Sequence, residues 1–490
     1  MGKIPLGAIP GHYAALLGED RVSLIHPEGE LSWGGLERAT NQRARRLAKL
    51  GVEADDLVTI ALPNGNRFFE TTFAIWKLGA TPHVVSSRLP AAELQEIIAV
   101  AKPRLVIGPD PEILPGTTVL PADFTATSHD DGPMPAKVAH YWKAMSSGGS
   151  TGRPKIIVDH NPAVFDPDEE DFLDMPSAGC LLNPGPLYHN APFIMAHRGL
   201  FRGNQVVGML RFDAAESLRL IEQHCVEWVM MVPTMMHRIW RLDAAEREAF
   251  DLSSLRIVSH VAAPMPVWLK QNWIDWLGSE RVWELYGGTE GTGVTWCSGT
   301  EWLAHKGTVG KTVRGSSVRI LDENGKDCPS GVMGEVYLMP EAGPGTSYHY
   351  IGAEAKVADG GWETLGDVGY VDEDGYLYLG DRRGDMIISG GANIYPAEVE
   401  STLAEHPGVD TVVAIGLPDE DMGELVHAIV QPHDDWNDKL NDTMLAEFVK
   451  ERLARYKTPR SYEFVTYSLR NDAGKVRRSQ LRAERIPTKA

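Results

Sequence analysis

Apolar runs alternate with amphipathic stretches along the first quarter of the chain. The runs at 57–62, 83–85 and 105–107 are short and almost wholly apolar, which is typical of buried strands. Between them, 68–78 and 90–101 have helical character, and the second places apolar residues at i, i+3, i+4 and i+7. The order strand, helix, strand, helix, strand predicts an α/β fold with parallel strands.

The pattern changes towards the C-terminus. A helix around 217–221 and a strand at 228–232 continue the α/β alternation, and hairpin turns are predicted at 366–370 and 372–376. Charges and glycines at 380–385 interrupt the apolar pattern and indicate a linker. A small α+β domain of about a hundred residues is expected beyond it. Its predicted helices and strands lie at 396–405, 443–453, 411–415 and 426–430.

Composition limits the classes of function. A chain of 490 residues with 43% hydrophobic and 23% charged residues predicts a globular protein with at least two domains. The net charge of −20 argues against a nucleic acid as the main partner. The four cysteines form no CxxC pair, and no apolar run reaches the ~18 residues of a membrane span. We expect a cytoplasmic protein without a signal peptide or a transmembrane segment.

The segment Ser146–Lys155 has the composition of a phosphate-binding loop. Small hydroxyl residues and glycines leave backbone N–H groups free to point at an anion, and two cations follow. A Walker A loop is excluded because Arg153 stands where its second glycine belongs. A flexible linker is the alternative, but an apolar, strand-like run follows directly.

Two further stretches carry candidate chemistry. Prolines and a glycine at 184–193 predict a turn that presents Tyr188 and His189. His189 and His197 are eight apart with no carboxylate between them, which matches no common metal site, so we favour a steric or hydrogen-bonding role for His189 over that of a satisfied core histidine. The methionines near Val232 either line an apolar pocket or fill the core.

A short apolar run before Tyr286 leads into two glycines, Thr289 and Glu290. Strand ends of this kind bind ligands in α/β sheets. A carboxylate beside a phosphate loop suits Mg²⁺, and an exposed turn is the alternative.

Taken in order, these segments resemble the adenylate-forming superfamily of acyl-CoA synthetases, nonribosomal adenylation domains and firefly-type luciferases. The matching motifs cover nearly the whole chain and lie at Ser146–Lys155, Tyr286–Glu290, Gly366–Asp367, Asp381–Arg382, Ser389–Glu400 and Gly474–Lys475. The resemblance implies a large multi-subdomain α/β domain over 1–380, a hinge at 381–385 and a small mobile α+β domain over 386–490. It also implies that a carboxylate attacks the α-phosphate of ATP, and that a thiol then takes the acyl group from the acyl-adenylate.

The resemblance implies a role for each matching residue. Lys475 bridges the substrate carboxylate and the α-phosphate, Thr289 contacts that phosphate, Glu290 holds Mg²⁺, and His189 belongs to the catalytic set. The other nucleotide-binding residues are Ser147, Gly148, Gly149, Ser150, Thr151, Gly152, Lys155, Ala262, Ala263, Pro264, Tyr286, Gly287, Gly288, Asp367 and Arg382. The thioesterification loop contains Ser389, Gly390, Gly391 and Asn393, and the acyl pocket contains Tyr188, His189, Asn190, Val232, Gly287 and Gly288. The usual hinge residue is replaced by Gly384, which leaves Gly384 or Asp385 as the pivot.

The expected function is an acid–CoA ligase that uses ATP, Mg²⁺ and coenzyme A. The 184–193 turn, the methionines and the two small glycines suggest a bulky apolar acid of the fatty, aryl or polycyclic steroid- or terpenoid-like kind. Alternatives are an enzyme that loads a carrier protein and a non-catalytic nucleotide-binding homologue. A homodimer is a further expectation.

Overall fold

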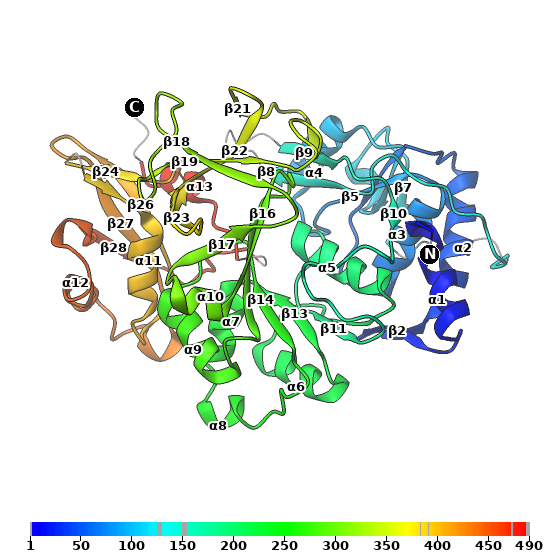
Figure 1. Ribbon diagram of the computed structural model, residues 1–490, viewed down its shortest axis with the longest axis horizontal. Helices are drawn as coiled ribbons and strands as arrows, with labels where there is room; N and C mark the ends of the chain where they lie inside the picture. The colour runs from blue at the N-terminus through cyan, green and yellow to red at the C-terminus, as the bar shows by residue number, and fades with distance from the viewer. Residues whose placement is uncertain are drawn as a thin grey trace.

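The computed structural model describes residues 2–122, 124, 130–148, 154–382, 384–390, 392–471 and 474–486. In Figure 1 the first helices lie at the right and the C-terminal elements, coloured orange to red, lie mainly at the left. Among the described residues, no helix combines the length and the apolar character needed to cross a bilayer.

The largest sheet has a parallel half and an antiparallel half. Its strands, in spatial order, are β18 (Ser317–Leu321), β19 (Gly334–Met339), β22 (Trp362–Val371), β23 (Leu377–Arg382), β17 (Thr308–Thr312), β16 (Val294–Ser298), β15 (Val282–Gly287), β14 (Ile257–His260), β13 (Trp228–Met231), β11 (Cys180–Asn183), β12 (Gln205–Gly208), β2 (Val22–His26) and β3 (Gly29–Ser32), with β21 (Val357–Ala358) beside β22. The strands from β2 through β15 in this order are parallel, and β15 pairs antiparallel with β16. Strands β11, β13 and β14 are buried along their whole length, as expected for parallel strands that are covered on both faces.

The second sheet contains the predicted β-α-β-α-β unit. Its order is β20 (Tyr348–Ile351), β9 (Pro154–Asp159), β8 (Ala144–Gly148), β5 (Thr81–Val84), β4 (Leu57–Ile60), β6 (Leu105–Gly108) and β7 (Val119–Pro121). Strands β4, β5 and β6 are parallel and are connected by α3 (Asn66–Lys77) and α4 (Ala91–Ala101), which confirms the prediction.

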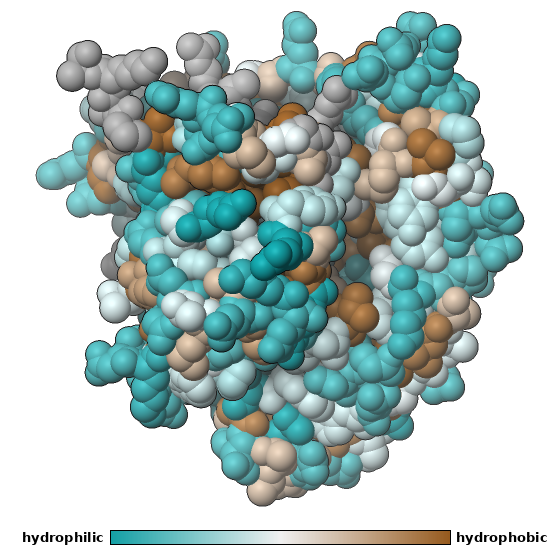
Figure 2. All heavy atoms as spheres, turned by 90° about the vertical axis from the view of Figure 1, so that its left-hand side faces the viewer, coloured by the Kyte–Doolittle hydropathy of each residue, from teal (hydrophilic) through white to brown (hydrophobic). Residues whose placement is uncertain are grey.

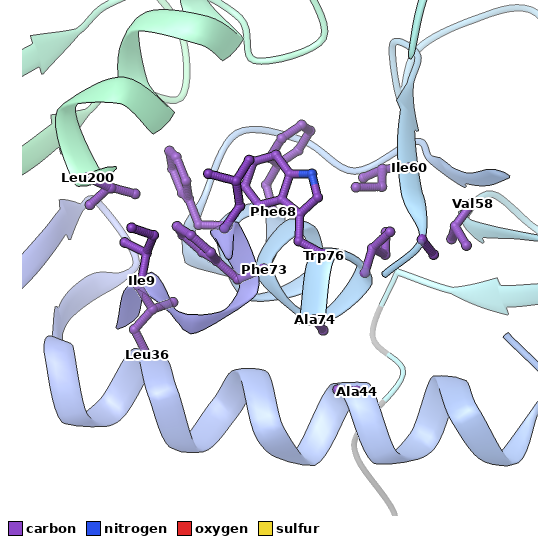
Figure 3. Packing of buried hydrophobic residues seen from close by; sticks show 14 of the residues in the cluster. Ile9, Leu36, Ala44, Val58, Ile60, Phe68, Phe73, Ala74, Trp76 and Leu200 are labelled. Atoms are coloured by element: carbon purple, nitrogen blue, oxygen red, sulfur yellow. The ribbon is translucent and has the colours of Figure 1, made fainter. Parts of the chain in front are cut away.

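The remaining helices of the large part cover the two sheets. They are α1 (Ile9–Leu17), α2 (Trp33–Lys49), α5 (Asn190–Phe201), α6 (Ala214–His224), α7 (Pro233–Trp240), α8 (Ala244–Arg247), α9 (Val267–Leu277) and α10 (Gly299–Ala304). The main core lies around α3, where Phe68, Phe73 and Trp76 lie between Ile60 of β4 and Leu200 of α5 (Figure 3). Because these side chains are almost wholly buried, each contributes about 1.5–3 kcal/mol or more of hydrophobic stabilisation.

The C-terminal elements form a core of their own. A sheet of β25 (Ala392–Ile394), β24 (Ile387–Ser389), β27 (Gly423–Pro432), β26 (Val409–Asp419) and β28 (Ser461–Phe464) packs with α11 (Pro396–Ala404), α12 (Asp442–Lys450) and α13 (Arg478–Ala483). This confirms the small α+β unit. Figure 2 shows the face of the molecule at this end, where hydrophilic residues dominate and hydrophobic ones form separate patches.

Two local predictions were wrong. Residues 366–370 form no turn but lie inside β22, while the turn at 372–376 is present, closed by a hydrogen bond from Gly375 N to Asp372 O. The predicted linker at 380–385 begins too early, because β23 continues through Arg382 and pairs with β22. Glycine and charge do not end a strand whose backbone hydrogen bonds are supplied by neighbouring strands.

Candidate active site

A cavity of about 2270 Å³ lies at the carboxyl ends of the parallel strands. Residues that follow β13, β14 and β15 line it, and so do the end of β8 and the loop that contains Lys475. Crevices at the carboxyl ends of strands are the usual ligand sites of open α/β sheets. The motifs that lie far apart in the sequence therefore share one cavity.

Tyr286 and Asp367 meet on one wall of the cavity. The Tyr286 hydroxyl donates to Asp367 Oδ2 at 2.8 Å, and both residues line the cavity. Asp367 lies opposite Arg382 in the register of β22 and β23. The residues predicted to contact adenine and ribose are thus held together by strand pairing and by a side-chain hydrogen bond.

Lys155, Tyr350 and Glu290 form a polar triangle. Lys155 Nζ lies 3.3 Å from Glu290 Oε1 and donates to the Tyr350 hydroxyl at 2.8 Å, and that hydroxyl donates to Glu290 Oε1 at 2.6 Å. Burial and the adjacent Glu290 carboxylate raise the pKa of Tyr350, so the phenol keeps its proton and its donor role. The triangle connects the predicted phosphate loop to the predicted metal ligand.

A buried histidine bonds to Ser146, the first residue of the predicted phosphate loop. His83 accepts or donates a hydrogen bond at 2.7 Å to Ser146 Oγ and at 2.9 Å to Thr59 Oγ1. Complete burial lowers the pKa of His83 to about 3, so the ring is neutral at pH 7. Ser147 pairs with Lys155 across β8 and β9. The predicted loop residues 149–152 lie outside the described residues, and for Gly148 only the backbone is described.

The segments that follow β14 and β15 form part of the cavity wall. Ala262 has a φ of 76°, a left-handed conformation that costs an L-residue roughly 1–2 kcal/mol and that suits glycine better. Ala263, Pro264, Gly287 and Thr289 also line the cavity.

The glycine pair at 287–288 does not leave open space. A Cβ added to Gly288 would lie 2.5 Å from Leu365 Cδ1, and one added to Gly287 would lie 3.1 Å from Gly293 O. The missing side chains therefore allow the chain to pack against itself, so they do not by themselves widen an acyl pocket.

The loop of Lys475 is tied to the C-terminal core. Lys475 N donates to Asn471 Oδ1 at 2.9 Å, and Arg470 donates to Gly474 O at 3.1 Å. Arg470 lies 3.4 Å from the buried Glu400 carboxylate, which also accepts two hydrogen bonds from Arg478 at 2.8 and 3.1 Å. Because buried charges of this kind are costly unless paired, the cluster fixes the position of Arg470, which in turn bonds to Gly474.

The same loop lies against the large part of the molecule. A Cβ on Gly474 would lie 2.8 Å from Thr234 Oγ1 and 3.4 Å from Val232 Cγ2. Burial, together with the positive charge of Lys475, lowers the pKa of His189 to about 3. The lysine thus lies at the cavity beside the predicted acyl pocket.

His189 is not a satisfied core histidine. Its Nε2 is buried and has no hydrogen-bond partner among the described residues, and the same holds for Asn190 Oδ1. Both residues line the cavity, together with Tyr188 and Val232. His197 lies in the core between aromatic rings and does not line the cavity; its Nδ1 bonds to Phe193 O at 2.7 Å, while its Nε2 is also buried without a partner among the described residues. Neither histidine belongs to a metal cluster, since the described residues contain no group of three potential ligands.

The methionines fulfil both expected roles. Met231, Met235 and Met236 belong to the core of the large sheet, whereas Met230 belongs to an apolar cluster with Trp228 and Met195. Met230, Met231 and Met235 also line the cavity.

The described residues of the predicted thioesterification loop lie outside the cavity lining. Among its described members, Ser389 and Gly390 do not line the cavity; Gly390 N donates to Met422 O at 2.8 Å. Gly391 lies outside the described residues, and for Asn393 only the backbone is described. At the candidate hinge, Gly384 and Asp385 line the cavity, and Asp385 lies 3.6 Å from Arg478.

Comparison with known proteins identifies the family. Residues 13–350 match the family model of AMP-binding enzymes, and residues 398–475 match that of the AMP-binding enzyme C-terminal domain. The chain therefore belongs to the AMP-binding, adenylate-forming enzymes and is an AMP-forming acyl-CoA ligase family enzyme.

Relatives extend over almost the full length. A feruloyl-CoA synthase of Amycolatopsis sp is 32% identical, with 93% of this chain and 94% of that protein covered. A 2-succinylbenzoate–CoA ligase of Bacillus licheniformis is 30% identical, with 95% and 98% covered. The solved o-succinylbenzoate CoA synthetase from Bacillus subtilis, in complex with its acyl-adenylate intermediate, has a TM-score of 0.81 at 24% identity and covers both chains fully. At this identity the likeness supports the fold alone.

Several site residues carried no signal in the sequence. Tyr350 lies in the short strand Tyr348–Ile351, which has no periodic pattern, and His83 lies inside a predicted strand. Arg470 and Arg478 flank the lysine loop at unremarkable spacing. The polar Thr81 and His83 alternate with apolar residues in β5, and this alternation is the signal that could have drawn attention to His83.

Proposed function

We propose that this protein is an ATP-dependent acid–CoA ligase that activates a bulky, mostly apolar carboxylic acid. The observation that carries the proposal is the position of Lys475. Its loop lies against Val232 and Thr234 at the cavity, and the same cavity is lined by Thr289, Glu290 and Asp367. This is the arrangement that adenylate formation requires.

In the proposed first step the acid carboxylate attacks the α-phosphate of ATP and pyrophosphate leaves. Lys475 provides a mobile point charge for the negative charge that develops on the phosphoryl oxygens, with Thr289 beside it. Ser147 and Lys155 contact the outgoing phosphates, while Asp367 and Tyr286 hold the nucleoside. Neutral His189 is proposed to separate the acyl-binding end of the cavity from the nucleotide-binding end.

Glu290 is proposed as the protein ligand of Mg²⁺. Its carboxylate lies beside a phosphate loop and a lysine, which fits an ion that takes one or two carboxylates and otherwise binds phosphate oxygens and water. When bound, the ion neutralises phosphate charge. The chain contributes the carboxylate and, through Tyr350, its orientation.

In the proposed second step coenzyme A attacks the acyl-adenylate and AMP leaves. The structure has Lys475 at the cavity, with the described residues of the 389–393 loop away from it. We propose that a rotation of the small domain, residues 386–490, about Gly384 or Asp385 exchanges these two loops. Such lid and domain motions commonly separate half-reactions.

The proposal is tested by acid-dependent ATP–pyrophosphate exchange over a panel of fatty, aryl and polycyclic acids, followed by mass spectrometry of the thioester after addition of CoA. Exchange and a CoA thioester with at least one bulky acid are expected. Absence of exchange with the whole panel would contradict adenylation.

A carrier protein is the alternative thiol. A fatty acid–[acyl-carrier-protein] ligase of Streptomyces coeruleorubidus is 30% identical over 92% of this chain. Exchange without a CoA thioester, combined with loading of a phosphopantetheinylated carrier, would favour that acceptor.

A further inference from the structure

Helix α5 presents two different faces. One face packs into the main core through Phe193, Ala196 and Leu200. The opposite stripe lines the cavity with Ala191, Ile194, Met195 and Arg198, at i, i+3, i+4 and i+7, and Arg202, directly after the helix, lines it as well. The cavity wall along this helix therefore starts apolar and ends in two cations.

The apolar part of the wall is continuous with the sheet. Ala191, Ile194 and Met195 pack in one cluster with Trp228 and Met230. Arg198 lies nine residues beyond His189, which is about 13 Å along a helix. An acid that is held by its carboxylate beside Lys475 would reach Arg198 only with its far end.

Arg198 has donors that the protein does not use. Its Nη2 lies 3.3 Å from Asp171 Oδ1, and its Nε is buried without a hydrogen-bond partner among the described residues. A guanidinium group has five N–H donors. A buried guanidinium donor without an acceptor is costly, and a ligand acceptor at the remaining N–H groups of Arg198 would stabilise the charged side chain.

The neighbouring carboxylates do not fully neutralise the positive charge at the Arg198 end of the cavity wall. Asp171 is shared with Arg202, whose Nε lies 3.5 Å from Asp171 Oδ2, and it also accepts from Leu173 N at 3.0 Å. Glu169 also lines the cavity and is paired with Arg314 at 3.4 Å. Asp166, a further carboxylate of the cavity lining, pairs with Lys3 at 3.9 Å. Four cations thus stand against three carboxylates, which leaves one positive charge for a ligand.

Building on the proposed function, we infer that the acid carries a second oxygen function at its far end, a carboxylate or a carbonyl, and that Arg198 binds it. A carboxylate would accept two parallel N–H donors, the geometry in which arginine binds most strongly. Arg198 is thus a specificity residue remote from the reacting carboxylate.

The test uses matched acids that differ only at the far end. Saturated mono-acids of eight to sixteen carbons are compared with α,ω-diacids of the same length, and a polycyclic acid is compared with its distal ketone. Values of kcat/KM for pyrophosphate release are measured with wild-type protein, with Arg198→Met, and with the control Arg256→Met. Arg256 is a half-exposed arginine outside the cavity lining that pairs with Asp174.

Wild-type protein is expected to prefer the distally oxygenated member of at least one pair by tenfold or more. Arg198→Met should lower kcat/KM for that acid by about tenfold to a hundredfold, as expected for hydrogen bonds to a charged group. The same variant should leave or raise kcat/KM for the matched mono-acid, and Arg256→Met should change neither. The unchanged mono-acid rate also shows that Arg198→Met is folded.

The possible failures are distinct. If mono-acids are activated but no pair of acids shows a preference, the proposed distal subsite is wrong, although adenylation is confirmed. The same conclusion follows if Arg198→Met lowers kcat/KM equally for both acids of a pair. If no acid of the panel releases pyrophosphate, the proposed function itself fails, and the inference fails with it.

Discussion

At the scale of single residues, the proposed role of Lys475 predicts different effects on the two half-reactions. Asn471 and Arg470 bond to the backbone of Lys475 and Gly474, and Lys475 lines the cavity in which adenylation is proposed to take place. Lys475→Ala should slow acyl-AMP formation by about 10²–10³, the loss typical of a preorganised electrostatic group. Conversion of synthetic acyl-AMP to the thioester should change by only a few-fold.

The two rates are measured by ATP–pyrophosphate exchange and by thioester formation from the synthetic adenylate. Lys450→Ala, an exposed lysine of α12, is the control. An equal loss in both steps would contradict the assigned role.

Glu290 offers a second prediction at this scale. Glu290→Gln keeps an acceptor for the Tyr350 hydroxyl but removes the charge that a hard cation requires. The apparent KM for Mg²⁺ should rise by about tenfold or more. Binding of AMP without metal, measured by calorimetry, should stay the same. A weakened AMP complex would point to general damage of the site instead.

At the scale of elements, α7 connects the two parts of the chain. Arg241, directly after α7, donates to Val409 O at the start of β26 at 2.5 Å, and Gly474 packs against Thr234 near the start of the same helix. One short helix thus supports the orientation in which Lys475 reaches the cavity.

Arg241→Ala should therefore lower the adenylation rate by about tenfold, the loss expected for one or two hydrogen bonds from a charged group. Thioester formation from synthetic acyl-AMP should be unchanged or faster, because the small domain is released more easily. Arg238→Ala, on the exposed face of α7, is the matched control. Equal slowing of both steps by Arg241→Ala would show that the residue supports only the stability of the fold.

At the scale of the whole molecule, buried neutral histidines make stability depend on pH. Burial lowers the pKa of His197 to about 3, well below the ~6.5 of an unfolded chain. The unfolded state therefore binds the proton first, so this stability is fully present above about pH 6.5 and is lost as the pH falls towards 3.

His197→Phe should remove this contribution, since the ring already lies among Phe68, Phe69 and Phe193. The free energy of unfolding of wild-type protein should fall by about 2 kcal/mol more between pH 7 and pH 5 than that of the variant. Urea unfolding at both pH values measures the difference, with His140→Phe at an exposed position as the control. Identical pH dependence of wild type and His197→Phe would contradict the account.

The division into 1–380, 381–385 and 386–490, the homodimer and the cytoplasmic location stay predictions. A C-terminal core separate from the large sheets agrees with a second domain. The position of the pivot would be decided by comparing Gly384→Pro with Asp385→Pro in the two half-reactions.

The sequence by itself determined the parallel β-α-β-α-β unit and the order of the family motifs, and it predicts that Ser146–Lys155 binds phosphate. These features are local: apolar periodicity, glycine content and short spacings express the backbone preferences of neighbouring residues. The predicted turn at 366–370 was wrong because it also rested on local signals alone. Pairing of this segment with another strand overrode the local turn preference.

Only the tertiary structure decided which side chains meet. Lys155 and Tyr350 are 195 residues apart, and His83 and Ser146 are 63 apart, yet each pair shares a hydrogen bond. The seating of the Lys475 loop on α7 and the cationic end of α5 likewise depend on how sheets and helices pack. Such contacts result from burial and from the pairing of buried polar groups, which act between elements and leave no periodic trace along the chain.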